Sequence, residues 1–307
     1  MEEKISVIIP NYNGRELLAK NLPKVLENCP GCEVIVVDDA SNDDSVAYIK
    51  KNYKRVKLLV NSKNAGFAKT VNCGVEKATG QYVLLLNSDV APQKGFLQSA
   101  MESFSKESQK TFAVGLSDFS HEEGKIIVRG RGGAKFIRGF INHYALPPKS
   151  GETLWVSGGS SLIDRQKFLE LGGFDSIFAP FYWEDIDLSY RARKKGYLCF
   201  FDENSKVDHF HQEGAIKKSS SGFRIKSISY KNQFLFVWKN IEDYWWITLH
   251  LLWLPYHFAR ALINRDFAFF TGFLWALTKI PQLVLSSNFE VHSSLSDREV
   301  LKKFEKQ

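Results

Sequence analysis

The chain has 307 residues and a hydrophobic content of 44%, which excludes a disordered or low-complexity protein. Its formal net charge of +7 favours anionic partners, whether nucleoside diphosphates, nucleic acid or an acidic membrane surface. The N-terminus lacks the apolar core of a secretory signal and the cysteines lack the second close pair of a zinc site, so we expect the catalytic part to lie in the cytoplasm.

Strand and helix patterns alternate through the first third of the chain. Apolar runs predict strands at 5–10, 34–37, 56–60 and 82–86, and helical spacing predicts helices from Arg15 to Pro30 and over 67–78. Ser41 with Asp44 resembles a capping box, so we expect another helix to start there. Strands that alternate with helices predict an α/β fold with a parallel, right-handed crossover sheet.

Carboxylates follow two of these strands. Asp39 comes after the second strand, and Asp89 ends the run Asn-Ser-Asp after the fourth. Because parallel α/β sheets bind ligands at the carboxyl ends of their strands, both residues are expected at one nucleotide pocket. Asp89 could hold a divalent cation there, although an isolated Asn-Ser-Asp run is also an ordinary polar turn. No glycine-rich phosphate loop follows the first strand, so a metal would supply the charge that a diphosphate needs.

The middle of the chain is less regular. A strand is expected at 112–117, and the basic, glycine-rich segment 129–151 suggests a mobile loop over a site. One Arg-Gly-Gly copy without paired aromatic residues argues against a nucleic-acid partner. Further strands are expected at 198–201 and 207–210, where His209 and His211 share one side and could bind a metal or be structural.

Acidic and aromatic residues gather at 181–188, before a helix expected over 186–195. Tyr182 and Trp183 offer ring faces on which a sugar can stack, and Glu184 or Asp185 could take a proton from a hydroxyl. The same acids could instead meet the dipole of the helix. Upstream of them, Gly159 and its glycine neighbour permit a close backbone approach to a ligand, or simply a bend.

The C-terminal part differs in composition from the rest. The segments 244–259 and 267–278 lack Asp, Glu, Lys and Arg, are rich in aromatic residues, and are too short to span a bilayer. We expect helices lying along an anionic membrane surface. An aromatic helical subdomain packed on the catalytic core and a tight hairpin in one leaflet are the alternatives. The end, 297–307, is polar and expected to fray.

Six segments in order resemble those of the inverting, nucleotide-sugar-dependent family 2 glycosyltransferases, nearest to the rhamnosyltransferase-like branch. They are SVIIPNYN at 6–13, VDDAS at 37–41, NAGFA at 64–68, LNSD at 86–89, GGFD at 172–175 and EDIDL at 184–188. The resemblance implies a GT-A catalytic domain over 1–222, with a nucleotide-binding half to about 117 and an acceptor half from about 118. A helical, membrane-associated region over 223–307 would follow.

The implied activity is metal-dependent transfer of a hexosyl or deoxyhexosyl group from a UDP- or dTDP-linked sugar. The acceptor would be a hydroxyl of a glycan or polyprenyl-linked molecule in surface polysaccharide synthesis, at the cytoplasmic face of the inner membrane. The alternative is a catalytically silent carbohydrate- or nucleotide-binding module with the same fold.

The resemblance also implies roles for individual residues. The donor-binding residues would be Pro10, Asn11, Tyr12, Asp39, Asn64, Gly66, Asn87 and Ser88, with Asp39 accepting from the base imide nitrogen. Asp89 and His209 would bind Mg²⁺ or Mn²⁺, although Asn87 replaces the first acid of the family's Asp-X-Asp motif. The catalytic pair would be Asp185 as general base and Glu184 beside it. The acceptor would be contacted by Gly159, Tyr182 and Trp183.

Overall fold

The computed structural model describes residues 4–106, 109–122, 124–210, 221–286 and 293–304. Its strands are β1 Ile5–Asn11, β2 Glu33–Asp38, β3 Lys57–Val60, β4 Tyr82–Leu86, β5 Val90–Pro92, β6 Thr111–Glu122, β7 Lys125–Arg129, β8 Gly132–Ile137, β9 Phe140–Ala145, β10 Gly151–Glu152, β11 Ser160–Asp164 and β12 Leu198–His209. Its helices are α1 Arg15–Asn28, α2 Ser45–Asn52, α3 Phe67–Lys77, α4 Phe96–Ser105, α5 Arg165–Glu170, η1 Ser176–Phe178, α6 Glu184–Lys194, α8 Gly222–Asn240, α9 Tyr244–Ile263, α10 Phe267–Leu277, α11 Ile280–Ser286 and α12 Asp297–Lys302.

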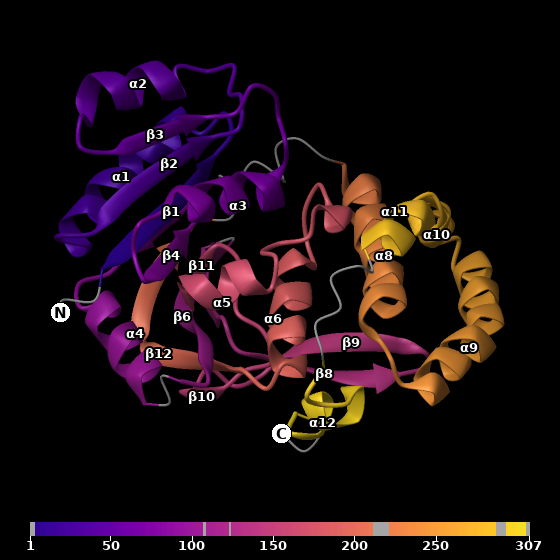
Figure 1. Ribbon diagram of the computed structural model, residues 1–307. Helices are drawn as coiled ribbons and strands as arrows, with labels where there is room; N and C mark the ends of the chain where they lie inside the picture. The colour runs from indigo at the N-terminus through magenta and orange to yellow at the C-terminus, as the bar shows by residue number, and fades with distance from the viewer. Residues whose placement is uncertain (1–3, 107–108, 123, 211–220, 287–292, 305–307) are drawn as a thin grey trace.

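A mixed sheet runs through the catalytic region in the order β10-β12-β6-β11-β4-β1-β2-β3 (Figure 1). The predicted parallel part is confirmed, because β4, β1, β2 and β3 pair in parallel. Beyond β4 the sheet continues through β11, which is antiparallel to both of its neighbours, β4 and β6. The sheet crosses from the nucleotide-binding half into the acceptor half without a break, and the expected division near 117 falls inside β6.

Helices cover both faces of this sheet, as an α/β fold requires. The side chains of β1, β2 and β4 alternate between the two faces, and both sets are buried, which explains their uninterrupted Val, Ile and Leu runs. One face packs against α1 and α4, and the other packs against α3, α5 and α6. The carboxyl ends of β1, β2 and β4 therefore share one edge, where the polar residues of the sequence motifs emerge.

Two sequence predictions about local structure are wrong. The helix expected at Ser41 begins at Ser45, because Ser41 donates to Asp38 through its main-chain N–H at 2.9 Å and its hydroxyl at 2.6 Å. The segment 129–151 is no simple loop, since most of it forms the antiparallel hairpin β8–β9. Phe140 and Ile141 are consecutive on β9 and both are buried, so this part of the strand is covered on both faces, and the burial stabilises the hairpin.

Two further expectations also change. The two short strands expected at 198–201 and 207–210 are parts of one strand, β12, whose pairing with β6 is interrupted between Asp202 and Lys206. The C-terminal end does not fray at 297–304, where α12 begins with a capping box between Ser296 and Glu299. Leu301 and Phe304 are fully buried there, so this short helix is held by core packing.

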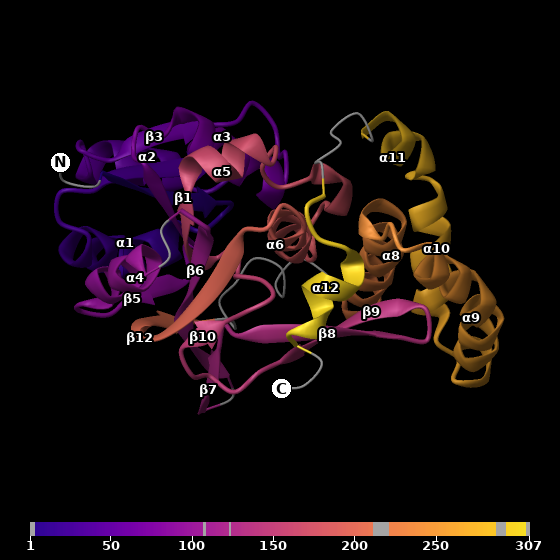
Figure 2. The same ribbon diagram turned by 60° about the horizontal axis from the view of Figure 1, so that its bottom comes forward.

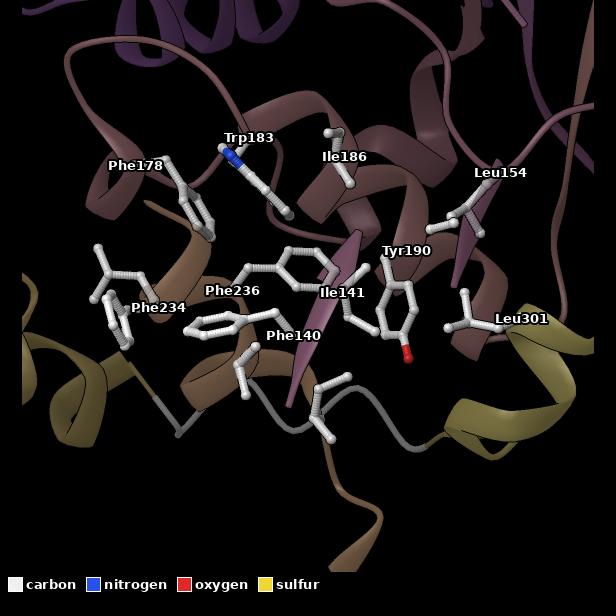
Figure 3. Close-up of a cluster of buried hydrophobic side chains, with 14 of the residues drawn as sticks. Phe140, Ile141, Leu154, Phe178, Trp183, Ile186, Tyr190, Phe234, Phe236 and Leu301 are labelled. Atoms are coloured by element: carbon white, nitrogen blue, oxygen red, sulfur yellow. The ribbon is translucent and has the colours of Figure 1, made fainter. Parts of the chain in front are cut away.

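The C-terminal helices share a hydrophobic core with the acceptor half. Phe234 and Phe236 of α8 pack among Phe140 of the hairpin and Ile186 of α6 (Figure 3). The helix α8 begins at the expected boundary near 222, yet it lies between α6 and α10 (Figure 2). Within the described ranges, no helix combines the length and the apolar character needed to cross a bilayer.

Candidate active site

The predicted metal ligands lie together. Asp89 follows β4 and His209 ends β12, and Asp89 Oδ1 is 3.2 Å from His209 Nε2. The other ring nitrogen, Nδ1, is 2.6 Å from Asp118 Oδ2, and Ser120 donates to the second oxygen of Asp118 at 2.8 Å. The antiparallel pairing of Val90 with His209 brings the two strand ends side by side.

This pair fits a divalent cation. Burial lowers the pKa of His209, but its hydrogen bonds to Asp118 and Asp89 outweigh burial and raise the pKa to about 9. At a pKa of about 9 the ring carries both protons at neutral pH, and it donates from Nδ1 to Asp118 and from Nε2 to Asp89. A cation bound between Nε2 and Asp89 would displace the Nε2 proton, while the bond to Asp118 holds the ring in the orientation that a metal-binding histidine requires. No group of three or more His, Cys, Asp or Glu side chains with metal-binding geometry occurs among the described residues. One carboxylate with substrate phosphates is, however, a common Mg²⁺ site. His211, the alternative ligand, lies outside the described residues.

The turn before β11 joins this centre to the predicted general base. Asn87 donates its main-chain N–H to the Gly159 carbonyl at 2.9 Å, and Gly158 donates its N–H to Asp185 Oδ2 at 3.3 Å. A Cβ on Gly159 would lie 2.3 Å from Asn87 Nδ2, so only glycine lets the two segments approach this closely. Gly159 therefore accommodates Asn87, and its predicted contact with the acceptor stays a prediction.

Two acids with perturbed pKa values begin α6. Burial, together with the neighbouring charge of Asp185, raises the pKa of Glu184 to about 8. Burial also raises the pKa of Asp185, although the N–H groups of Gly158 and Ile186 act in the opposite direction. One oxygen of Glu184 is buried without a hydrogen-bond partner. Buried acids with raised pKa values are suited to proton transfer near neutral pH.

The third acid of this run has a different environment. Burial would raise the pKa of Asp187, but the charges of Arg191 and Lys239 lower it. Arg191 lies 2.7 Å away and Lys239 of α8 lies 2.8 Å away, and Asn240 donates to the same carboxylate. Asp187 therefore ties α6 to α8, and its environment differs from that of Glu184 and Asp185.

The two predicted aromatic platforms differ in exposure. Tyr182 is 43% exposed, whereas Trp183 is 4% exposed and packs with Phe236 and His143 (Figure 3). The interpretation of Trp183 as a sugar-stacking face is therefore wrong, because α8 and the hairpin β8–β9 cover its ring. The sequence around Trp183 could not show that its ring is covered, because the residues that cover it are distant in sequence.

At the nucleotide end, the polar side chains bind the protein's own backbone. Asp39 accepts from the N–H groups of Ala65 at 2.8 Å and Gly66 at 2.9 Å, and from the Asn61 amide at 2.8 Å. This places the loop that contains the exposed Asn64 beside the carboxyl end of β2. Asp39 retains accepting capacity for a base, since a carboxylate offers about four lone-pair sites.

The first strand presents a mixed set of groups. Asn11 is buried and donates to Asp38 at 2.8 Å, so its predicted contact with the donor is wrong and it braces the ends of β1 and β2. Tyr12 is 36% exposed and Pro10 is half-buried, and both stay candidates for contact with the base or ribose. The Ser88 carbonyl accepts from Asn21 of α1 at 2.9 Å, which leaves the Ser88 hydroxyl for the donor.

Asp118 was not identified from the sequence. It lies on β6 and meets His209 from 91 positions away, within an alternating stretch that reads as an ordinary strand. Ser160, at the start of β11, also donates toward it at 3.4 Å. The available signal was an acid directly after the strand predicted at 112–117, because an acid that becomes buried at a strand end needs a partner.

Comparison with known proteins agrees with this geometry. The family described as Glycosyl transferase family 2 matches residues 6–172. The chain belongs to glycosyl transferase family 2. This match contains the motifs from SVIIPNYN to LNSD and the glycine turn, and α6 with its two acids begins at Glu184, after the match has ended.

Curated relatives of this family 2 chain include polysaccharide and cell-wall enzymes. Chondroitin synthase of Escherichia coli is 25% identical over 71% of this chain and 36% of its own length. The N-acetylglucosaminyl-diphospho-decaprenol L-rhamnosyltransferase of Mycobacterium tuberculosis is 22% identical over 69% of this chain and 76% of its own length. The chain spans between 26% and 40% of the length of several other curated glycosyltransferases that it matches more locally.

Solved structures show that the family 2 chain has the GT-A fold. A structure of GalNAc-T7 with UDP, GalNAc and Mn²⁺ has a TM-score of 0.63 and 20% identity, covering 78% of this chain and 48% of that one. A structure of Staphylococcus aureus TarS 1-349 with UDP has a TM-score of 0.55 and 15% identity, covering 83% of this chain and 72% of that one.

Proposed function

We propose that this protein is an inverting, metal-dependent transferase that moves a hexosyl or deoxyhexosyl group from a UDP- or dTDP-linked sugar. The acceptor is a hydroxyl of a glycan or polyprenyl-linked molecule in surface polysaccharide synthesis. The observation that carries this proposal is the turn at Gly158 and Gly159, which contacts Asp185 on one side and Asn87 on the other. It brings a proton acceptor and the Asp89 centre to the same edge of the sheet.

Asp89 and His209 would hold Mg²⁺ or Mn²⁺, with Asp118 orienting the imidazole. The cation, when bound, neutralises the charge that develops on the departing diphosphate. Asn87 stands at the position of the first acid of the Asp-X-Asp motif, so this position offers the cation a neutral amide and no second negative charge. Asp39 holds the Asn64 loop beside the strand end, and Tyr12 has the exposure needed to contact the base.

Asp185 is the general base of this mechanism. It takes the proton of the acceptor hydroxyl as the oxygen attacks the anomeric carbon, and the bond to the diphosphate oxygen breaks on the opposite face. Single displacement inverts the configuration. Glu184, whose pKa is raised to about 8, is protonated at neutral pH and therefore adds no second negative charge beside Asp185.

We also propose that the protein lies on the cytoplasmic face of the inner membrane. The helices α9, α10 and α11 bury one side against the core and leave apolar side chains on the other, on the side of the molecule opposite α1 (Figure 1). The exposed set includes Trp245, Leu252, Ile263, Phe267, Leu274 and Leu285. These exposed apolar side chains, together with the exposed Arg260 and Arg265, suit an anionic leaflet.

The test is a panel of UDP- and dTDP-sugars with Mg²⁺ or Mn²⁺, followed by the anomeric configuration of the product by NMR. We expect metal-dependent release of the nucleotide with one donor, and an inverted linkage when an acceptor is supplied. Retention of configuration would contradict the mechanism. Binding of UDP without turnover of any donor would favour the silent binding module.

A further inference from the structure

The helix α8 binds the loop that precedes the two acids. Asn232 is fully buried, and its amide nitrogen lies within hydrogen-bonding distance of three carbonyl oxygens of this loop. They belong to Phe178 at 2.7 Å, Phe181 at 3.0 Å and Tyr182 at 2.8 Å. The adjacent Lys231 donates its ammonium group to the Ala179 carbonyl. Asn232 and Lys231 of α8 therefore provide hydrogen-bond donors for four main-chain carbonyls of this loop.

This loop has an unusual backbone. Tyr182 and Trp183 have φ values of +70° and +75°, in the left-handed region that bulky residues rarely adopt. Such conformations are strained and persist only where surrounding contacts enforce them. The next two residues are Glu184 and Asp185. The direction in which the acids leave the loop is therefore set by the bonds from α8 and by the buried Trp183 ring.

The loop also faces the donor side. A Cβ on Gly66 would lie 4.0 Å from the Pro180 carbonyl oxygen, so the loop that Asp39 holds and the loop that α8 holds approach each other. Lys231 interacts electrostatically with Glu184 as well. One loop thus contacts α8, adjoins the donor segment and leads directly into the acids.

We propose that Asn232 and Lys231 are positioning residues of the transfer reaction, which hold the loop 178–183 so that Asp185 faces the acceptor hydroxyl. This inference rests on the proposed transferase function. It makes α8 a part of the active site, although this helix lies outside the family match. The side-chain hydrogen bonds of Asn232 and Lys231 end on carbonyls of the loop and none reaches a predicted donor-binding residue, so their loss should change turnover much more than donor binding.

The main variant is Asn232→Asp, which keeps the shape of the side chain but replaces the donating nitrogen by an oxygen that the carbonyls repel. Lys231→Met removes the second donor and keeps the apolar stem. Because a misplacement of about 1 Å can cost about 100-fold in rate, we expect kcat to fall about 10- to 100-fold in N232D and less in K231M. The donor KM should stay within about threefold.

Two variants on the same helix serve as controls. Asn240→Ala removes a buried asparagine that binds Asp187, and it should lower Tm while leaving kcat near the wild-type value. Gln233→Ala, next to Asn232, removes a 3.4 Å bond to the Ile141 carbonyl of the hairpin and should change neither. All rates are measured at a temperature at which circular dichroism shows each variant folded.

Hydrogen exchange over residues 178–187 supplies a measurement independent of activity. We expect faster exchange in N232D and wild-type exchange in Q233A. A kcat for folded N232D within about twofold of wild type, or a loss of kcat in N240A as large as in N232D, would overturn the positioning role. A wild-type protein that turns over no nucleotide sugar would instead refute the proposed function, while the exchange data would still report whether Asn232 orders the loop.

Discussion

Replacement of Asp185 by asparagine should affect the stability of the fold and the rate of transfer in opposite directions. The contacts of the Asp185 side chain give the size of the effect on stability. The Asp185 side chain accepts from the Ile186 N–H at 2.8 Å and from the Gly158 N–H at 3.3 Å. Asparagine can keep the shorter bond, so the substitution loses one long hydrogen bond, worth about 1 kcal/mol. This loss is offset because asparagine, unlike aspartate, places no carboxyl group in the buried site.

The direction of the charge effect follows from the raised pKa. Because folding raises the pKa of Asp185, the stability it contributes is present at low pH and is lost as the pH rises through the folded value. At neutral pH, which is above the ordinary pKa of an aspartate, the raised pKa of Asp185 therefore disfavours folding, and D185N removes that penalty. We expect the Tm of D185N to equal or exceed that of the wild type at pH 7.5.

Turnover should respond in the opposite direction. Loss of the general base is expected to lower kcat for transfer by about 10²- to 10⁴-fold, with little change in UDP affinity. Differential scanning fluorimetry, calorimetric titration with UDP and initial rates measure the three quantities on one preparation. A D185N variant that keeps more than about a tenth of wild-type kcat would refute the base assignment, since a general base contributes at least about 100-fold. A fall in Tm of several degrees would refute the charge argument.

Four other outcomes are expected. Asp89→Ala should abolish the effect of Mn²⁺ on UDP affinity in calorimetric titration, and an unchanged metal effect would place the cation elsewhere. Because the pKa of Glu184 is raised to about 8, the wild type should lose stability from pH 6 to pH 9 more steeply than Glu184→Gln in thermal unfolding; parallel curves would contradict this. Gly159→Ala should weaken UDP binding about tenfold or more by displacing Asn87, which lies 2.3 Å from the new Cβ, and unchanged affinity would argue against that role. Leu252→Glu, at a position that is 70% exposed, should reduce flotation with anionic liposomes without lowering Tm; a wild-type protein that never floats would refute the membrane proposal.

The sequence could predict the parallel half of the fold because its signals are local. Short runs such as Val83 to Leu86 are buried on both faces, and helices with apolar spacing separate them, so strand order and direction follow from general rules. These rules bring Asp39 and Asp89 to one edge. The same local logic failed for the hairpin β8–β9, whose strands are stabilised by helices that come about a hundred residues later.

Whether a polar or aromatic residue faces a ligand was decided by tertiary contacts. Asn11 reads as a donor contact, yet it binds Asp38 from 27 positions away; Trp183 reads as a platform, yet α8 covers it. Asp118 becomes a partner of His209 only because β6 and β12 pair in parallel. The sequence by itself determined which elements form and where chemistry-bearing residues leave the sheet, because these depend on periodicity. The availability of each side chain depends on partners distant in sequence, and only the folded chain brings those partners together.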